Sequence, residues 1–326
     1  MRAWLARAYG GPGVLVAGEL PVPRPRAGEV LIRVEASTVS AADRRIRAMD
    51  FPRGLGLVGR AVFGFRRPRR PVLGVEATGI VVAVGSAVER FRPGDAVIAL
   101  CGARMGAHAE YLLLNERAAM VPRPSGMALE TAAALAFGGT CARDYLRRGA
   151  LHPGERMLVI GASGTVGSAV VQLAAAAGAR VTGVSSAPNL DLVRSLGAEE
   201  VIDYTTKDIL ATGERFDIVA DAVGALDFSR AQAILAEGGR YLAINGSVAD
   251  MLARPRGSRR CIAGPAAERA DDLAALVDLA TAGRFRPLID CILPFEAAVQ
   301  AHARVDTGRK RGSVVLRLEE QGGTEE

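Results

Sequence analysis

Short apolar runs separated by turn residues make up the chain as far as about residue 120. Residues 29–35 alternate polar and apolar positions, which is the pattern of a strand with one buried face. Residues 79–85 form a second apolar run, and the turn Arg92–Asp95 leads into a third run at 96–100. This pattern predicts a strand-rich unit at the N-terminal end of the chain.

From Leu129 the period becomes helical, and strands then alternate with helices. The expected strands are 181–184, 200–202, 216–220, 240–244 (after a turn at 237–239) and the closing strand 312–318, and the expected helices are 189–196 and 271–282. Such an alternation predicts a parallel, doubly wound sheet with helices on both faces, an α/β fold.

The most informative motif follows the apolar run Met157–Ile160. Three glycines stand there at spacing three, and an Ala/Val/Leu-rich helix begins at once. A strand, a glycine turn and a helix N-terminus place backbone N–H groups and the positive end of the helix dipole where an anion can bind. The motif predicts a dinucleotide pyrophosphate site formed by Gly161, Ala162, Ser163, Gly164, Thr165, Val166 and Gly167.

The turn after the second strand of this unit bears on the choice of cofactor. It contains Ser185, Ser186 and Asn189, and no carboxylate stands between Arg180 and Asn189. An NAD site usually has an acidic residue here for the ribose hydroxyls, whereas small hydroxyl and amide groups suit a 2′-phosphate. NADPH is therefore favoured over NADH, although the turn has no Lys or Arg. The same residues are also compatible with a cap of the following helix.

Length and composition are those of a globular enzyme, with 326 residues of which 49% are hydrophobic and 23% charged. No apolar run approaches the roughly 20 residues that a membrane span needs. The first residues lack the apolar block of a signal peptide. We therefore expect a cytoplasmic protein with no membrane partner.

The net charge of +6 comes almost entirely from arginine, because Lys207 and Lys310 are the only lysines. This bias is typical of a GC-rich genome, and we expect no nucleic-acid partner. The dense cluster at 66–71 is interpreted as a solvated loop, with a channel for a phosphorylated cofactor or acidic substrate as the alternative. The four cysteines are far apart, which favours free thiols over a zinc knuckle or disulfides.

Six segments, taken in order, resemble the medium-chain dehydrogenase/reductase superfamily and, within it, the zinc-free quinone-oxidoreductase (zeta-crystallin-like) branch. They are 74–85, 91–95, 132–140, 154–167, 193–204 and 307–316. The resemblance covers essentially the whole chain. It implies a GroES-like β-barrel catalytic domain at 1–122, completed by 264–326, and a Rossmann dinucleotide-binding domain at 123–263. It also implies an active site in the cleft between the domains, and a homodimer.

This sequence lacks the metal ligands that the alcohol-dehydrogenase branch of the superfamily has. This chain has Ser40 where that branch has a cysteine and Val75 where it has a histidine, and the four-cysteine structural lobe is missing. We therefore expect no metal site. Hydride transfer to a conjugated acceptor needs a metal less than carbonyl reduction does, because the developing charge is delocalised.

These features together predict NADPH-dependent reduction of a small-molecule conjugated carbonyl, namely a quinone, an enone or an enoyl thioester, in the interdomain cleft. Two alternatives stay open. One is a non-catalytic NADPH-binding protein with a structural or regulatory role. The other is a dedicated tailoring reductase of a polyketide-like intermediate.

Carried over residue by residue, the resemblance implies catalytic positions at Ser40, Asp43 and Lys310. For the cofactor it adds Thr140 near the nicotinamide, Tyr204 near the 2′-phosphate and Asn245 beside the carboxamide, which complete the predicted cofactor residues.

The proton donor is not identified by the sequence. Arg47, His108 and water are further candidates beside the residues above. For Asp43 the alternative is a helix-capping carboxylate, and for His108 it is a hydrogen-bonded histidine at a strand edge. The long apolar segment Phe51–Pro71 is compatible equally with a lid over the cleft and with a peripheral loop or dimer contact.

Overall fold

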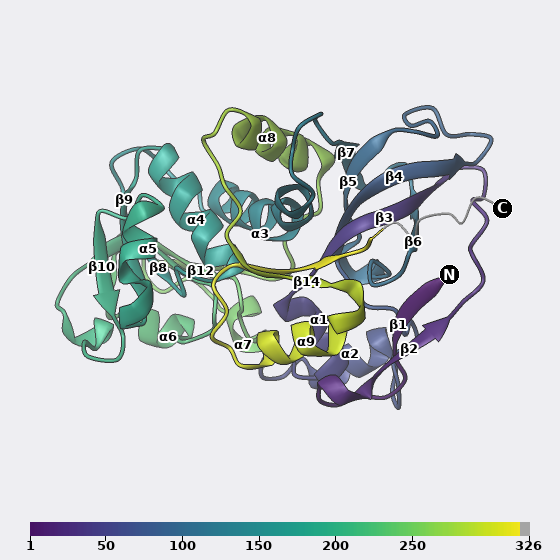
Figure 1. Ribbon diagram of the computed structural model, residues 1–326. Coiled ribbons are helices and arrows are strands. Elements are labelled where there is room, and N and C mark those ends of the chain that lie inside the picture. Colours follow the sequence, from purple (N-terminus) through teal and green to yellow (C-terminus); the bar gives the residue numbers. More distant parts are fainter. Residues whose placement is uncertain (320–326) are drawn as a thin grey trace.

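The computed structural model describes residues 1–319 and has two large sheets, with the long helix α3 (Leu129–Arg148) between them (Figure 1). Residues 320–326, the end of the segment expected to complete the first domain, lie outside this description. No helix within residues 1–319 has the length and apolar content that crossing a bilayer requires.

One sheet has six strands, all parallel, in the order β10-β9-β8-β11-β12-β13. The strands are β8 (Arg156–Ile160), β9 (Arg180–Ser185), β10 (Glu200–Asp203), β11 (Phe216–Asp221), β12 (Leu235–Ala243) and β13 (Arg260–Ala263). The chain winds outward in both directions from the central pair β8 and β11. This order confirms the doubly wound Rossmann sheet expected from the alternation of strands and helices.

Both faces of the parallel sheet are covered because each strand sends successive side chains to opposite sides. Met157 and Val159 of β8 lie in the core shared with α3, α4 (Thr165–Ala176) and α8 (Ala270–Thr281). Leu158 and Ile160 lie in the core of the other face. The remaining helices of this unit are α5 (Leu190–Ser195), α6 (Phe228–Ala231) and α7 (Val248–Met251), with 3₁₀ turns at Ala187–Asn189 and Ile209–Ala211.

The other sheet has seven strands and is mostly antiparallel, with the order β14-β15-β3-β4-β5-β7 and with β6 paired to β3. Its strands are β3 (Glu29–Val39), β4 (Glu76–Val84), β5 (Ala96–Leu100), β6 (Tyr111–Asn115), β7 (Ala119–Pro122), β14 (Ile289–Pro294) and β15 (Ser313–Arg317). The chain thus returns to its N-terminal sheet, as in a GroES-like unit. The domain boundaries after 122 and 263 stay a prediction.

Smaller elements surround this sheet. They are the hairpin β1 (Arg2–Ala6) and β2 (Leu15–Glu19), the helices α1 (Ala41–Ala48), α2 (Gly56–Phe63) and α9 (Ala298–Asp306), and 3₁₀ turns at Pro12–Val14, Gly102–Arg104 and Phe295–Ala297. The hydrophobic period did not reveal α1 or α2, because an eight-residue helix spans only about two turns.

The start of β12 was wrong in the sequence-based prediction. Residues 237–239, expected as a turn, lie inside the strand, which begins at Leu235. The pairing of β12 with β11 shifts register between Phe216 and Ile218, and this irregularity accommodates the two glycines without ending the strand.

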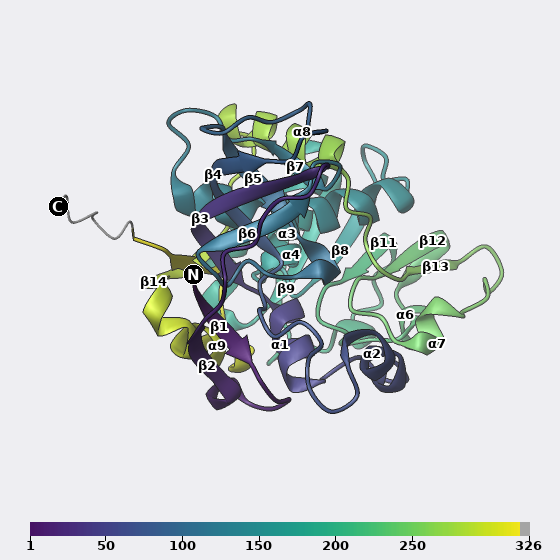
Figure 2. The same cartoon turned by 90° about the vertical axis from the view of Figure 1, so that its right-hand side faces the viewer.

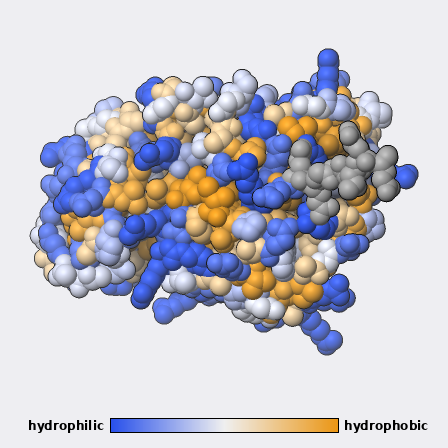
Figure 3. Space-filling model, in the orientation of Figure 1, coloured by the Kyte–Doolittle hydropathy of each residue, from blue (hydrophilic) through white to orange (hydrophobic). Residues whose placement is uncertain are grey.

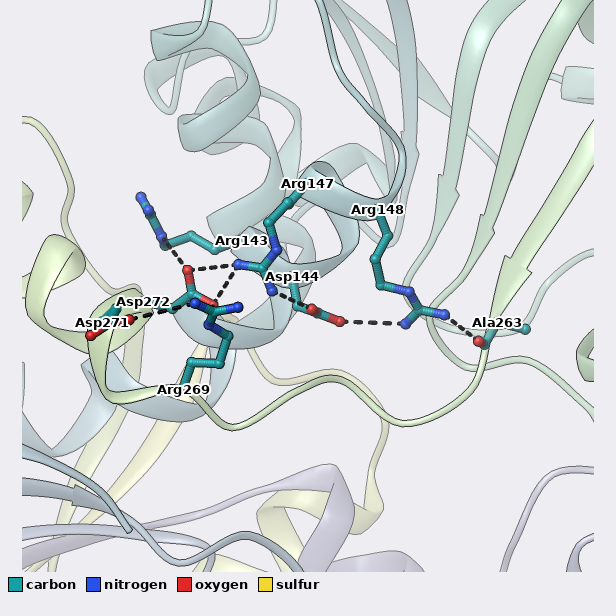
Figure 4. A network of polar contacts seen from close by, with 8 residues as sticks. All are labelled: Arg143, Asp144, Arg147, Arg148, Ala263, Arg269, Asp271 and Asp272. Atoms are coloured by element: carbon teal, nitrogen blue, oxygen red, sulfur yellow. Dashed lines mark hydrogen bonds and ion pairs between the residues drawn. The ribbon is translucent and has the colours of Figure 1, made fainter. Parts of the chain in front are cut away.

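An ion-pair network joins α3 to α8 (Figure 4). Asp272 of α8 accepts hydrogen bonds from Arg147 at 2.7 and 2.9 Å and from Arg143 at 3.3 Å, both on α3. Arg148 continues the network to the carbonyl oxygen of Ala263 at the end of β13. Burial alone would raise the pKa of Asp272, but the arginine contacts outweigh burial and lower it.

We expect Asp272→Asn to lower the free energy of unfolding by about 2 kcal/mol at pH 7, because Arg143 loses its carboxylate partner and Arg147 keeps only Asp144. The pKa of Asp272 in the folded state lies below its ordinary value of 3.8. Its stabilising contribution is therefore present above that pH and is lost as the pH falls through the folded-state pKa. Denaturant unfolding at pH 7 and pH 3 measures both effects.

The neighbouring Asp271 gives the control. Its side chain is 88% exposed and lies 3.5 Å from Arg269 alone, so Asp271→Asn should change the free energy by less than about 0.5 kcal/mol. Equal losses in the two variants would show that the network does not stabilise the packing of α3 on α8.

Candidate active site

A cavity of about 1390 Å³ lies at the carboxyl ends of β8, β11 and β12. One wall is the glycine turn at 161–167, and the opposite wall is formed by α1 and the segment Asp50–Gly54. In open α/β sheets, ligands bind where the strand order reverses, which here is between β8 and β11. This cavity therefore stands where the topology predicts a ligand site.

The three glycines of the turn serve different purposes. Gly161 has φ +80°, a conformation that side chains disfavour, and a Cβ on Gly167 would stand 2.1 Å from the Gly161 carbonyl oxygen. Gly164 has φ −80° and ψ 173°, and a Cβ there would meet no described atom closer than 3.4 Å. Gly161 and Gly167 are thus required by the fold, whereas Gly164 leaves open space on the cavity wall.

The helix α4 begins directly after Gly164, so the N–H groups of its first turn have no partner within the helix. Thr165, Val166 and Gly167 line the cavity at this point. These donors and the helix dipole fit an anionic diphosphate, as the motif predicted. Ala162 and Ser163 are buried behind the turn.

The C-terminal segment adds a cation to this end of the cavity. The Gly312 N–H donates to the Ser163 carbonyl oxygen at 2.9 Å, and the Thr165 hydroxyl donates to the Gly312 carbonyl oxygen at 2.7 Å. Lys310 Nζ lies 2.5 Å from Thr165 Oγ1, and burial lowers its pKa to about 8. Lys310 was expected among the catalytic residues; the structure places its ammonium group beside Thr165 of the glycine turn, and a catalytic role stays a prediction.

The turn after β9 lies beside the cavity and does not line it. Ser185 is buried with its hydroxyl 2.8 Å from that of Ser163, and Asn189 donates to the Ser186 hydroxyl at 3.1 Å. An arginine reaches this turn from the C-terminal segment, since Arg311 donates to the Pro188 carbonyl oxygen at 3.1 Å. The sequence pattern missed Arg311 because it follows the turn by more than a hundred residues.

Two further predicted cofactor residues also lie off the cavity wall. Thr140 is buried within α3, where its hydroxyl donates to the Ala136 carbonyl oxygen at 2.7 Å. Tyr204 is exposed beyond the end of β10. Their contacts with a cofactor stay predictions.

Ser40 and Asp43 form a capping box at the start of α1. Ser40 Oγ accepts from the backbone of Ala42 and Asp43, and Asp43 Oδ2 accepts from the Ser40 N–H and hydroxyl, both at 2.7 Å. Asp43 Oδ1 accepts from the Gly74 N–H, also at 2.7 Å. Both residues are buried and neither lines the cavity. These are the contacts of the helix-cap alternative, and a catalytic role for either residue stays a prediction.

The other candidate proton donors are also held away from the cavity. Arg47 is buried and donates to the Gly10 carbonyl oxygen, to His302 Nδ1 and to Asp306. His108 is buried beside Thr38, with its Nε2 at 2.9 Å from the Thr38 carbonyl oxygen. This contact agrees with the alternative of a hydrogen-bonded histidine at a strand edge.

The capping box positions a residue that sequence reasoning missed. Arg45 of α1 lines the cavity and donates to Asn245 Oδ1 at 2.6 Å, while Asn245 Nδ2 donates to the Val223 carbonyl oxygen at 2.8 Å. Burial lowers the pKa of Arg45 from its ordinary value. The Ser40-x-x-Asp43 cap was the signal that could have predicted α1 and hence Arg45 on the cavity wall.

The side chains around Ser40 and Val75, where the alcohol-dehydrogenase branch has its zinc ligands, do not fit a zinc ion. Within residues 1–319, no group of three His, Cys, Asp or Glu side chains is arranged to hold a metal. The carboxylate of Glu76 is engaged by the Thr38 hydroxyl and the Phe137 N–H, each at 2.5 Å. Zinc needs three or four such donors converging on one point.

Two known protein families match separate segments of the chain. Residues 26–125 match the alcohol dehydrogenase GroES-like domain, and residues 196–316 match a family described as zinc-binding dehydrogenase.

Whole-length relatives are similar as well. The chain is 30% identical to an NADPH-dependent alkenal/one oxidoreductase of Arabidopsis thaliana and 31% identical to a 2-methylene-furan-3-one reductase of Solanum lycopersicum. Each match covers 97% of this chain and 79% of the relative. A quinone oxidoreductase structure from Coxiella burnetii superposes with a TM-score of 0.84 at 24% identity, covering 98% of this chain and 99% of the other, and shows the shared fold.

We expect Gly164→Val to weaken binding of a nicotinamide dinucleotide roughly 100-fold or more while leaving the melting temperature within a few degrees of wild type. The backbone at Gly164 is extended and open, so the protein accommodates valine, but the side chain blocks the approach to the α4 N–H groups. Titration followed by nicotinamide fluorescence measures the affinity.

Gly167→Ala is the contrasting variant. Its Cβ would meet the Gly161 carbonyl oxygen at 2.1 Å, so we expect a loss of stability of roughly 2–4 kcal/mol. Retention of full affinity by Gly164→Val would mean that the turn is not the phosphate site.

Proposed function

The chain belongs to the medium-chain dehydrogenase/reductase superfamily, in its quinone-oxidoreductase branch, and on this premise we propose that it is a zinc-independent, NADPH-dependent reductase of conjugated carbonyl compounds. The chain is an oxidoreductase of a family that uses NAD(P)H, which removes the non-catalytic alternative. The observation that carries the proposal is one cavity lined both by the glycine turn and by the half-buried Arg45.

The chain's own residues would hold the cofactor in a defined direction. The first turn of α4 and Lys310 would bind the diphosphate, and Asn245 would lie near the nicotinamide end. When bound, NADPH supplies a hydride that, with one proton, saturates a conjugated double bond or reduces a quinone and leaves NADP⁺. The cavity would hold the acceptor in a fixed orientation to the nicotinamide. Such orientation supplies a large part of the rate enhancement.

Preference for NADPH over NADH is supported by the charge around the turn after β9. The guanidinium of Arg311 lies on this turn, together with the small polar side chains of Ser186 and Asn189. An arginine recognises a phosphate with several charge-assisted hydrogen bonds. The Arabidopsis relative is also named as NADPH-dependent.

Arg45 would stabilise the acceptor in place of a metal. During hydride addition to an enone or quinone, negative charge develops on the carbonyl oxygen, and a donor already oriented in a dry site stabilises it strongly. Arg45 is held in place by Asn245, and its remaining N–H groups are available on the cavity wall. The named relatives reduce alkenals or enones and methylene furanones, which are acceptors of this kind.

The proton would come from solvent. Ser40, Asp43, Arg47 and His108 do not line the cavity. The enolate or hydroquinone anion formed after hydride addition is basic enough for water to protonate it. The homodimer implied by the family resemblance stays a prediction.

We expect EDTA-treated protein to oxidise NADPH when offered an ortho-quinone or a simple α,β-unsaturated ketone, with at least roughly tenfold lower kcat/KM for NADH. Loss of nicotinamide absorbance measures both rates, and metal analysis of the same sample checks for bound zinc. Activity that is lost with EDTA and restored by zinc would contradict the metal-independent proposal.

A second test concerns the stabilising residue. Arg45→Met should lower kcat roughly 100-fold while NADPH affinity changes less than about threefold, because the arginine acts on charge that develops only in the transition state. Arg44→Met is the control, since Arg44 is already paired with Asp50 at 2.8 Å. Equal effects of the two substitutions on kcat would remove Arg45 from the mechanism.

A further inference from the structure

The helix α2 presents an apolar face to solvent. Leu57 is 79% exposed, Val62 is 54% exposed and Phe65, just beyond the helix, is 61% exposed; Val58 is exposed beside them. In a helix, positions 57, 58, 61 and 62 share one side, and here all four are apolar. An exposed apolar face of this kind marks an interaction site.

The other side of α2 is fixed to the protein. Phe51 stacks on Phe63 with ring centroids 5.7 Å apart, and Gly59 packs directly against the Phe51 ring. Beyond the helix, the Arg69 N–H donates to the Phe63 carbonyl oxygen at 2.7 Å and Tyr9 donates to the Gly64 carbonyl oxygen at 2.6 Å. This packing fixes the orientation of α2, so its other side, with the apolar residues, faces solvent.

A cluster of exposed arginines follows α2 directly in the chain. The segment 51–71 contains six arginines and no acidic residue, so its charge of +6 equals the net charge of the whole chain. Arg66, Arg67, Arg69 and Arg70 are all exposed, within five residues of one another. A hollow of about 690 Å³ beside them is lined by Arg7 and residues 64–69, and it is large enough for anionic groups. We refer to Leu57, Val58, Val62, Phe65 and these four arginines as the α2 surface.

The α2 surface is continuous with the active-site cavity. Residues 50–54, immediately before α2, form part of the cavity wall, and the Val248 N–H donates to the Arg53 carbonyl oxygen at 3.2 Å. Figure 2 shows α2 at the lower edge of the molecule. The exposed residues of α2 do not line the cavity, so their contacts are not those of a closed lid.

The charge decides between the partners that could cover this surface. A second copy of the chain, related by twofold symmetry, would bring two arginine clusters together with no acidic residue of the segment between them. Apolar side chains on a helix beside a dense basic cluster are instead the combination that binds an anionic bilayer: the apolar groups enter the interface and the arginines contact lipid phosphates.

We propose that the α2 surface docks the protein on an anionic lipid bilayer. The docked orientation places residues 51–54 of the cavity wall near the bilayer, and the link to the reaction rests on the proposed function. An apolar quinone or enone dissolved in lipid would then be the substrate class of the enzyme. The proposal amends the expectation of no membrane partner, because it concerns a bilayer surface and not a spanning segment.

Vesicle co-sedimentation of the full chain, without cofactor or substrate, tests the docking. Vesicles of phosphatidylcholine alone are compared with vesicles containing phosphatidylglycerol. We expect binding to the anionic vesicles to be at least roughly tenfold tighter and to weaken steeply with added salt. Binding that is absent, or equal for the two compositions, would overturn the proposal.

Two pairs of variants locate the surface. Arg66→Gln with Arg67→Gln should weaken vesicle binding roughly tenfold or more, whereas Arg24→Gln with Arg26→Gln, at an exposed site elsewhere, should change it less than about twofold. Val62→Ser should weaken binding severalfold, whereas Val16→Ser, at a residue 47% exposed on β2, should not. Equal effects within either pair would overturn the assignment to α2.

Two further readouts separate this proposal from its alternatives. A change of oligomeric state in Val62→Ser, with no vesicle binding by the wild type, would assign the surface to a second copy. Because docking is measured without turnover, failure of the NADPH assay leaves the docking result intact, and failure of docking leaves the assay intact. With both positive, anionic vesicles should raise the rate with a lipid-dissolved quinone in wild type and not in the Arg66/Arg67 variant.

Discussion

The contact between Gly312 and the glycine turn is the constraint on which the active site depends. The N–H of Gly312 donates to Ser163, its carbonyl oxygen accepts from Thr165, and Gly164 and Gly312 form a parallel bridge. These bonds join the end of one sheet to the glycine turn of the other. They bring Lys310 to the glycine turn and Arg311 to the turn after β9.

The electrostatics of the cavity follow from this constraint. Lys310 and Arg45 are both partly or wholly withdrawn from water, which lowers the pKa of each. Neither has a carboxylate within hydrogen-bonding distance among the contacts of the described residues, so their charge is available to an anionic ligand. A cofactor diphosphate at one end and a developing oxyanion at the other would supply the missing negative charge. The buried acids, Asp43 and Glu76, are instead occupied by backbone and hydroxyl donors.

The segment Phe51–Pro71 contributes to two different surfaces of the protein. Its first residues contribute to the cavity wall, and its helix and arginine cluster face solvent. The hydrophobicity of α2 is not needed for its packing, which uses Phe51, Gly59 and Phe63 on the opposite side. The lid, loop and dimer interpretations of this segment all assumed one partner, whereas the structure gives its two ends separate surroundings.

The sequence by itself determined the parallel sheet, the glycine turn at the start of α4 and the absence of an acid after the second strand. These features are local, since strand and helix periods and the Gly161–Gly167 spacing are set within a few residues of chain. Only the tertiary structure decided which cations face that turn and which arginine lines the cavity. The contacts of Lys310 with Thr165, Arg311 with Pro188 and Arg45 with Asn245 join residues 145, 123 and 200 positions apart. No local pattern encodes such pairs, because they form only when the two sheets pack around α3 and the chain returns to its first sheet.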